Sequence, residues 1–287
     1  MWETGSMKPR LTPEERRDRR QRAVRKSMFV LPSSITMASI FCGFSSVVMS
    51  INAAGATPER YFLWAGGLLV LAGVFDGLDG RVARATNTAT EFGVQLDSLA
   101  DVISFGMAPA ILAYRYAFFH LGIHDSTLRA AGWAACFVFT ACGALRLARF
   151  NVQVRAVDPR YFVGLPIPAA AAAVASIIIW HPVPPVRATH AYAFAVELFL
   201  VGLLMVSTLR FPSFKKASAS PRTSMVTSLM VVLLFALMIL FQQRFFIGFF
   251  STYITLGLLL NLAWKAGWRG VTPPLDGDGV EDPETVH

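Results

Sequence analysis

Charged residues are scarce in this sequence. Only 15% of the 287 residues are Asp, Glu, Lys or Arg, whereas an ordinary soluble domain carries about a quarter. Apolar residues make up 54% of the chain, the mean hydropathy is +0.51, and no polar stretch is long enough to form a second, soluble domain. The composition excludes an ordinary soluble protein and predicts a polytopic membrane protein.

Cysteine is also rare. Cys42, Cys136 and Cys142 lie in apolar runs and lack the spacing of metal ligands. An odd number of cysteines in apolar segments does not indicate a disulfide framework. We therefore expect these three residues to be small packing residues without a chemical role.

Long apolar runs, in contrast, are abundant. A helix needs about 20 apolar residues to cross a bilayer, and on that scale the sequence predicts about eight spans. They cover residues 31–53, 61–80, 95–119, 130–150, 166–181, 191–209, 224–242 and 246–264. The predicted fold is therefore all-α, a polytopic integral membrane protein with about eight transmembrane helices.

The positive charges are distributed unevenly along the chain. If the N-terminus is cytoplasmic, 21 of the 26 Lys and Arg residues fall in cytoplasmic segments. Cytoplasmic loops are enriched in these residues, so we expect both termini to be cytoplasmic, together with the connection between the second and third spans. The exceptions lie on or near the opposite side: Arg60, Arg115, Arg129, Arg187 and Arg244.

The two ends of the chain differ from its middle. Residues 1–28 form a basic juxtamembrane segment, which either sets the topology or lies as a helix on an anionic leaflet. Residues 29–265 hold the transmembrane domain. Residues 266–287 are acidic and rich in Pro and Gly, and we expect them to be disordered. Membrane lipids are the expected surroundings, and no nucleic-acid partner is expected.

Four aspartates stand at the facing ends of the second and third predicted spans. Asp76 and Asp79 are three residues apart and Asp97 and Asp101 are four apart, so each pair shares one face of a helix. An antiparallel hairpin would bring the four carboxylates together, where their charges repel. One or two divalent cations would relieve this repulsion, and oxygen ligands suit Mg²⁺ or Mn²⁺. The pattern predicts a metal site.

Small residues and an arginine lie between the two pairs. Gly80, Ala83 and Gly93 allow a bulky ligand or another helix to approach the backbone. Arg84 is one turn from Gly80 and could bind a phosphate with two hydrogen bonds. A metal site with these neighbours indicates pyrophosphate chemistry, since phosphoryl transfer needs charge neutralisation and a carboxylate that takes a proton. An ion or proton pathway is the alternative, although no second acidic site leads onward.

The stretch from Asp76 to Asp101 resembles the signature of the CDP-alcohol phosphatidyltransferases. It has the form Asp-x2-Asp-Gly-x2-Ala-Arg-x8-Gly-x3-Asp-x3-Asp and matches at every fixed position and gap. In that family an alcohol attacks the phosphate of a CDP-linked lipid and CMP leaves. The resemblance implies that Asp76, Asp79 and Asp97 bind metal. It also implies that Asp101 completes a two-metal site and acts as the base.

The resemblance also assigns the nucleotide contacts. It implies that four residues hold the CDP moiety: Gly80, Ala83, Arg84 and Gly93. Thr36 in the first span matches as a further nucleotide contact, whereas Ser39 stands where we would expect Asn. Residues 29–265 would then be a catalytic domain.

Segments on either side of the signature indicate which alcohol is the acceptor. "GALRLARFN" at 143–151, "GLPIPAAAA" at 164–172 and "LMVSTLRFPSFK" at 204–215 resemble the membrane-embedded phosphatidylserine synthases of that family. With "LPSSITMASIFCGF" near the start, the resemblance covers residues 30–216. It implies CDP-diacylglycerol and L-serine as substrates, and two Mg²⁺ or Mn²⁺ ions. It further implies a homodimer. We expect the protein in the plasma membrane of a prokaryote, and the distribution of Lys and Arg predicts that the site faces the cytoplasm.

Three residues at a predicted cytoplasmic helix end support an amino-acid acceptor independently. Arg146 and Arg149 share a helix face and Asn151 follows; arginine is well shaped to bind the carboxylate of serine. The same residues could instead anchor the topology or contact a lipid phosphate. The same chemistry with glycerol phosphate, inositol or choline is the second hypothesis, and a cation transporter is the alternative from another class.

Overall fold

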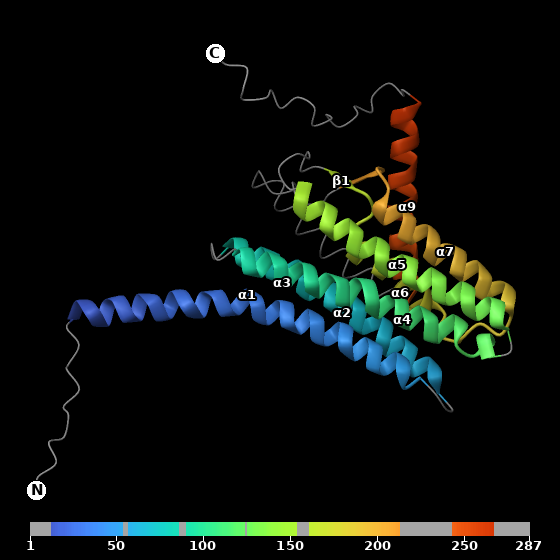
Figure 1. The fold of residues 1–287 in the computed structure, drawn as a ribbon, viewed down its shortest axis with the longest axis horizontal. Coiled ribbons are helices and arrows are strands. Elements are labelled where there is room, and N and C mark those ends of the chain that lie inside the picture. The colour runs from blue at the N-terminus through green and yellow to red at the C-terminus, as the bar shows by residue number, and fades with distance from the viewer. Residues whose placement is uncertain are drawn as a thin grey trace, which may run out of the picture.

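The protein is a bundle of α-helices (Figure 1). The computed structural model describes residues 13–53, 57–85, 90–123, 125–153, 161–212 and 243–266. Its α-helices are α1 (Pro13–Ile51), α2 (Pro58–Ala85), α3 (Glu91–Asp101), α4 (Ala108–Ala113), α5 (Ser126–Gln153), α6 (Ile167–Trp180), α7 (Ala188–Val206) and α9 (Gln243–Lys265). Two π-helical segments, η1 (Val102–Met107) and η2 (Tyr114–Phe118), continue α3 and α4, and η3 (Leu121–Ile123) is a short 3₁₀ helix.

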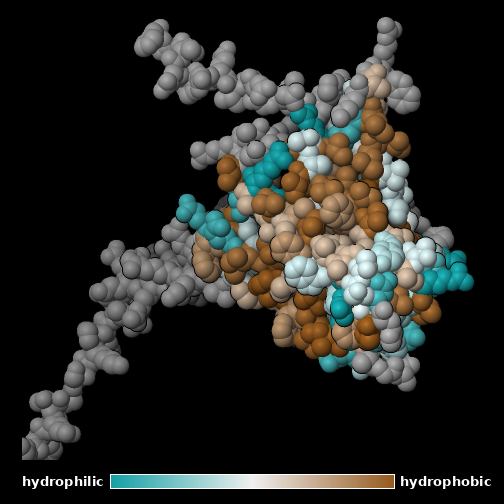
Figure 2. Space-filling view, turned by 45° about the vertical axis from the view of Figure 1, so that its right-hand side comes forward, coloured by the Kyte–Doolittle hydropathy of each residue, from teal (hydrophilic) through white to brown (hydrophobic). Residues whose placement is uncertain are grey.

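Six of the described segments are long and apolar enough to cross a membrane, judged by length and composition. They are Pro32–Ile51, Pro58–Ala83, Glu91–Phe118, Ser126–Val152, Ala188–Val206 and Ile247–Trp264. The predicted span 166–181 is the shorter helix α6, and the predicted span 224–242 lies outside the described residues. Apolar side chains cover much of the surface in Figure 2, with polar side chains gathered towards its margins. The prediction of a mostly helical membrane protein is confirmed; eight spans and cytoplasmic termini stay predictions.

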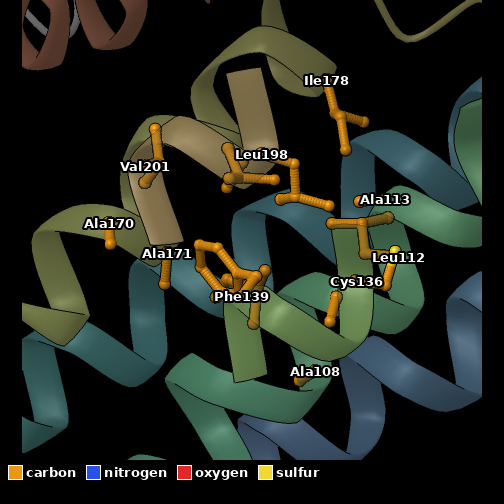
Figure 3. Packing of buried hydrophobic residues seen from close by; sticks show 14 of the residues in the cluster. Ala108, Leu112, Ala113, Cys136, Phe139, Ala170, Ala171, Ile178, Leu198 and Val201 are labelled. Carbon is orange, nitrogen blue, oxygen red and sulfur yellow. The ribbon is translucent and has the colours of Figure 1, made fainter. Parts of the chain in front are cut away.

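Helix α6 is largely enclosed by the helices around it. Nine of its 14 residues are buried, and at 1.5 Å per residue it is about 21 Å long, shorter than the roughly 30 Å of a bilayer core. A helix that is apolar on all sides is enclosed by its neighbours instead of facing only one of them. Ala170 and Ala171 of α6 belong to the same buried apolar cluster as Phe139 of α5 and Leu198 and Val201 of α7, part of which Figure 3 shows.

A stripe of small residues runs along the buried face of α1. Thr36, Ser39, Gly43, Ser46 and Ser50 recur at intervals of three and four residues, and all are buried. Lipid tails are as apolar as the side chains they surround, so helices in a membrane associate through close packing and polar contacts. Small residues permit both, which explains why α1 packs extensively against α2 and also against α3 and η1.

Hydroxyl groups of this stripe bind the backbone of α2. The Ser39 hydroxyl donates a hydrogen bond to the carbonyl of Ala72 (3.2 Å), and the Ser46 hydroxyl donates to the carbonyl of Ala65 (2.9 Å). The later serine of α1, Ser46, bonds to the earlier residue of α2, Ala65. The two helices are therefore antiparallel.

Helix α1 is parallel to the helix that begins with α3. The Ser104 hydroxyl donates to the carbonyl of Ser39 (3.1 Å), and the Arg115 guanidinium donates to the carbonyl of Ser50 (3.2 Å), both across 65 residues of sequence. Arg115 also donates to the carbonyl of Ile51 (3.1 Å). It thus satisfies carbonyl groups at the C-terminal end of α1, where a cation is favoured by the helix dipole.

A two-stranded sheet is the exception to the predicted all-α fold. Strand β1 (Tyr161–Val163) pairs antiparallel with β2 (Arg210–Pro212), and Gly164 follows β1 with φ at 75°. Asn261 of α9 accepts a hydrogen bond from the Arg210 N–H (2.9 Å) and donates one to the Arg210 carbonyl (2.8 Å). The side chain of Asn261 therefore pairs with the free edge of β2 and holds α9 against it.

We predict that Gly164→Ala destabilises the protein. An L residue at this positive φ costs about 1–2 kcal/mol, and the added methyl group would overlap the carbonyl oxygen of Met205. Thermal unfolding of the purified protein in detergent should show a midpoint several degrees lower. Gly67→Ala is the control, because a methyl there meets nothing within 4 Å and lies in a helix. Equal midpoints for the two variants would contradict the assigned conformation of Gly164.

Candidate active site

Three aspartates converge between α2 and α3. Carboxylate oxygens of Asp76, Asp97 and Asp101 lie within 4.8 Å of one another, and each residue is partly buried. The carboxyl groups of Asp76 and Asp101 are in hydrogen-bonding contact. The convergence arises because Asp97 and Asp101 are one turn apart on α3 and face α2, which runs in the opposite direction. The structure thus brings together three of the four predicted metal ligands.

Asp79, the fourth predicted ligand, is directed elsewhere. It is only 5% exposed, accepts a hydrogen bond from the Thr36 hydroxyl (2.7 Å), and also accepts one from the backbone N–H of Gly80. Residues three apart on a helix differ by about 60° in direction, so Asp79 can turn to α1 while Asp76 turns to α3. The hydroxyl of Thr36, a predicted nucleotide contact, lies against Asp79.

Arg146 brings a buried positive charge close to the carboxylates. This residue of α5 is 8% exposed, and its guanidinium is near enough to Asp101 and to the phenol of Tyr253 for electrostatic interaction. Its Nε atom has no hydrogen-bond partner in the described part of the chain. A buried polar group that lacks a partner costs about 1–3 kcal/mol. An anionic ligand beside Asp101 would supply the missing acceptor.

The other two predicted acceptor residues make contacts that hold the helices together. Arg149 donates a hydrogen bond to the carbonyl of Val206 at the end of α7 (3.4 Å). Asn151 donates to the hydroxyl of Ser98 (2.9 Å), in the turn between the two aspartates of α3. These contacts tie the end of α5 to its neighbours. Arg146 is therefore better placed than Arg149 to meet a substrate.

The small residues of the signature lie near the end of α2 and the start of α3. The N–H of Gly93 donates to the hydroxyl of Thr90, the N-cap of α3 (3.0 Å), and a methyl group on Gly93 would lie 3.2 Å from that hydroxyl. Gly80 and Ala83 are partly buried. The side chain of Arg84 lies outside those that the structure describes, so its contact with CDP stays a prediction.

Two features near the site were not predicted from the sequence. The π-helical segment η1 begins directly after Asp101; such segments are frequent at functional sites but have no simple sequence pattern. Tyr253 of α9 lies near enough to Arg146 for electrostatic interaction, and its ring packs against Phe211 of β2 with ring centres 6.0 Å apart. The apolar sequence of α9 predicted a membrane span, but it did not predict that α9 lies near Arg146 and the aspartates.

The donors of this site fit a hard divalent cation. All three are carboxylates, which Mg²⁺ and Mn²⁺ prefer, and no His or Cys belongs to the group. Oxygens on opposite sides of one Mg²⁺ are about 4.2 Å apart, slightly less than the 4.8 Å that contains the present group. The three carboxylates could together supply three of the six oxygen ligands of one Mg²⁺, and water or substrate oxygens would supply the others.

Comparison with known proteins relates this arrangement to an enzyme family. The family model of the CDP-alcohol phosphatidyltransferases matches residues 29–204. The chain is similar to a CDP-diacylglycerol–serine O-phosphatidyltransferase of Helicobacter pylori strain 26695, with 39% identity over 190 residues, which are 66% of this chain and 74% of that protein. For the enzyme of that name from Methanocaldococcus jannaschii, the identity is 31% over 190 residues, 66% of this chain and 77% of that protein. An archaetidylserine synthase of Methanothermobacter thermautotrophicus is 35% identical over 198 residues, 68% of this chain and 74% of that protein.

We predict that Thr36→Val lowers the free energy of unfolding by about 1–3 kcal/mol, because the buried carboxyl group of Asp79 loses a hydrogen-bond donor. A double-mutant cycle with Asp79→Ala, followed by thermal unfolding, isolates the interaction of the pair. Thr140→Val is the control, since the Thr140 hydroxyl bonds to carbonyls of Gly106 and Cys136. The losses in unfolding free energy of Thr140→Val and Asp79→Ala should add in the double variant, whereas those of Thr36→Val and Asp79→Ala should not. Additive losses for Thr36→Val and Asp79→Ala would show that the proposed pairing is wrong.

Proposed function

The chain belongs to the CDP-alcohol phosphatidyltransferase family, and we propose that it transfers the phosphatidyl group of CDP-diacylglycerol to the hydroxyl of L-serine and releases CMP. It is a membrane-embedded transferase of phospholipid biosynthesis. The observation that carries the proposal is the group of three carboxylates within 4.8 Å, beside the buried guanidinium of Arg146. The serine acceptor is supported by relatives that are named for it.

The three converging carboxylates are the proposed metal ligands. Asp76, Asp97 and Asp101 would hold Mg²⁺ or Mn²⁺, and two ions would be present with the lipid substrate. Asp79 supports the site from the adjoining turn, where Thr36 and Gly80 hold its carboxylate. When bound, the ions supply neutralisation of the pyrophosphate charge and stabilisation of the leaving phosphate.

Asp101 is the proposed base. It contacts Asp76 and lies near Arg146, so its carboxylate faces both the metal ligands and the buried cation. In the proposed reaction Asp101 accepts the proton of the serine hydroxyl while the hydroxyl oxygen attacks the phosphorus that carries the diacylglycerol. The bond from this phosphorus to the oxygen of CMP breaks, and CMP leaves with the electron pair. The products are phosphatidylserine and CMP.

Arg146 is the proposed partner of the serine carboxylate. The planar guanidinium matches a carboxylate with paired hydrogen bonds, and the Nε atom of Arg146 is buried without a partner among the described residues. The carboxylate would be held while the hydroxyl faces Asp101. Arg149 and Asn151 would support this arrangement by fixing the end of α5.

The nucleotide would lie where α2 ends and α3 begins. The residues proposed to hold it are Gly80, Ala83, Arg84 and Gly93, with Thr36 nearby. The acyl chains would remain in the bilayer, which the apolar outer surface of the helices supports. We propose that this end of the bundle faces the cytoplasm, because most Lys and Arg residues belong to segments on that side.

Release of CMP by the purified protein in detergent tests the function. With CDP-diacylglycerol and Mg²⁺ or Mn²⁺, we expect CMP only when L-serine is added, and not with glycerol 3-phosphate, inositol or choline. Asp101→Asn should reduce turnover by at least about 100-fold, the usual contribution of a general base. If CMP were released with another alcohol instead, that alcohol and not serine would be the acceptor. Absence of release with every alcohol under both metals would contradict the proposed reaction and favour a transport role.

We predict that Arg146→Ala raises the KM for L-serine at least about tenfold, because a paired ionic contact is lost, and changes the KM for CDP-diacylglycerol by less than about twofold. Steady-state kinetics of CMP release measure both constants. Arg149→Ala is the comparison, because its contact with Val206 is internal to the protein. It should raise the serine KM clearly less than Arg146→Ala does, because Arg149 acts only by fixing the end of α5. Equal increases of both constants in Arg146→Ala would assign this arginine to the lipid phosphate.

A further inference from the structure

Ser39 lies at the centre of a hydrogen-bonded link between three helices. Its side chain is 2% exposed, and its hydroxyl donates to the carbonyl of Ala72 on α2 (3.2 Å). Its own carbonyl accepts a hydrogen bond from the hydroxyl of Ser104 in η1 (3.1 Å), a residue that is fully buried. One residue of α1 is therefore bonded to both helices that carry the converging aspartates.

The two bonds reach the chain close to the carboxylates. In an α-helix the carbonyl of residue i accepts from the N–H of residue i+4, so the Ala72 carbonyl lies at the base of the turn that presents Asp76. Ser104 follows Asp101 by less than one turn. A displacement of Ser39 relative to α2 or η1 would therefore also displace the helical turns next to Asp76 and Asp101.

Helix α1 packs tightly against η1 near Ser39. A methyl group on Gly43, one turn after Ser39, would lie 2.8 Å from the Cα atom of Ser104. Only a glycine permits this approach of the α1 and η1 backbones. The hydroxyl of Ser104 is therefore held against α1 both by its hydrogen bond and by close packing.

We propose that Ser39 is a positioning residue that sets the separation between Asp76 on α2 and Asp101 at the end of α3. A ligand set must be held to within about 0.5 Å for its metal, and the hydrogen bonds of Ser39 join both helices to a common partner. The proposal rests on the proposed function in one respect, that these carboxylates hold a divalent cation. Ser39 itself touches neither the cation nor a substrate.

Ser39→Ala tests this role against a matched control. Ser46→Ala also removes a buried serine hydroxyl of α1 that donates to a carbonyl of α2, that of Ala65, but it lies two turns further from the aspartates. Both variants lose one hydrogen bond between the same two helices. Their unfolding midpoints without metal should therefore fall by similar amounts, whereas only Ser39→Ala should alter the metal site.

The measurement is the rise of the unfolding midpoint in detergent as Mn²⁺ is added, which reports binding without turnover. Residues that orient metal ligands typically contribute about 10–100-fold to affinity. We expect Ser39→Ala to require at least about tenfold more Mn²⁺ for the half-maximal rise, and Ser46→Ala to match the wild type within about twofold. The Mn²⁺ dependence of CMP release should shift in parallel.

Two further variants keep the test independent of poor folding. Ser104→Ala removes only the link to η1 and should weaken Mn²⁺ binding as Ser39→Ala does, while Ser39→Thr retains the hydroxyl and should restore binding. Equal Mn²⁺ requirements for Ser39→Ala and Ser46→Ala would overturn the positioning role and leave the proposed function intact. A wild-type protein whose midpoint did not respond to Mn²⁺ or Mg²⁺ would overturn both.

Discussion

Mutual repulsion among three carboxylates is the constraint that the helices around them must satisfy. Two unit charges within 4.8 Å of each other repel by at least about 3.5 kcal/mol at an effective dielectric constant near 20. Three such pairs together approach the whole folding free energy of a typical domain, about 5–15 kcal/mol. The arrangement therefore needs a cation or a shared proton to offset the charges, and a scaffold that does not let the helices separate.

That scaffold relies on polar contacts because lipid offers little hydrophobic force between helices. Hydroxyl groups of α1 bond to backbone carbonyls of α2, and the hydroxyl of Ser104 bonds back to α1. Arg115 satisfies the last carbonyls of α1, and Asn261 does the same for the edge of β2. The contacts of Arg115 and Asn261 satisfy backbone groups at a helix end and a strand edge, which lack partners in their own element, whereas the hydroxyl groups of α1 and η1 give helix carbonyls a second hydrogen bond.

Hydropathy was sufficient to predict a mostly helical membrane protein, and the aspartate spacing predicted the meeting of Asp76 with the two aspartates of α3. They did not predict the hydrogen bond that Asp79 accepts from Thr36, because Thr36 belongs to another helix and is distant in sequence. The π-helical turn after Asp101 and the approach of α9 to Arg146 were also not predicted. Local spacing indicates which residues share a helix face, whereas the partner of that face is decided by long-range packing.

The charges of the site also bear on how many cations it needs. When ionised, the three carboxylates carry three negative charges, and the guanidinium of Arg146 offsets one of them. The remaining two negative charges match a single divalent cation. The pyrophosphate of a CDP-linked lipid brings about two more negative charges into the same space, which a second divalent cation would balance. Under the proposed function, charge balance would favour one ion in the free protein and two with the lipid bound, and the second ion and the nucleotide would then bind cooperatively.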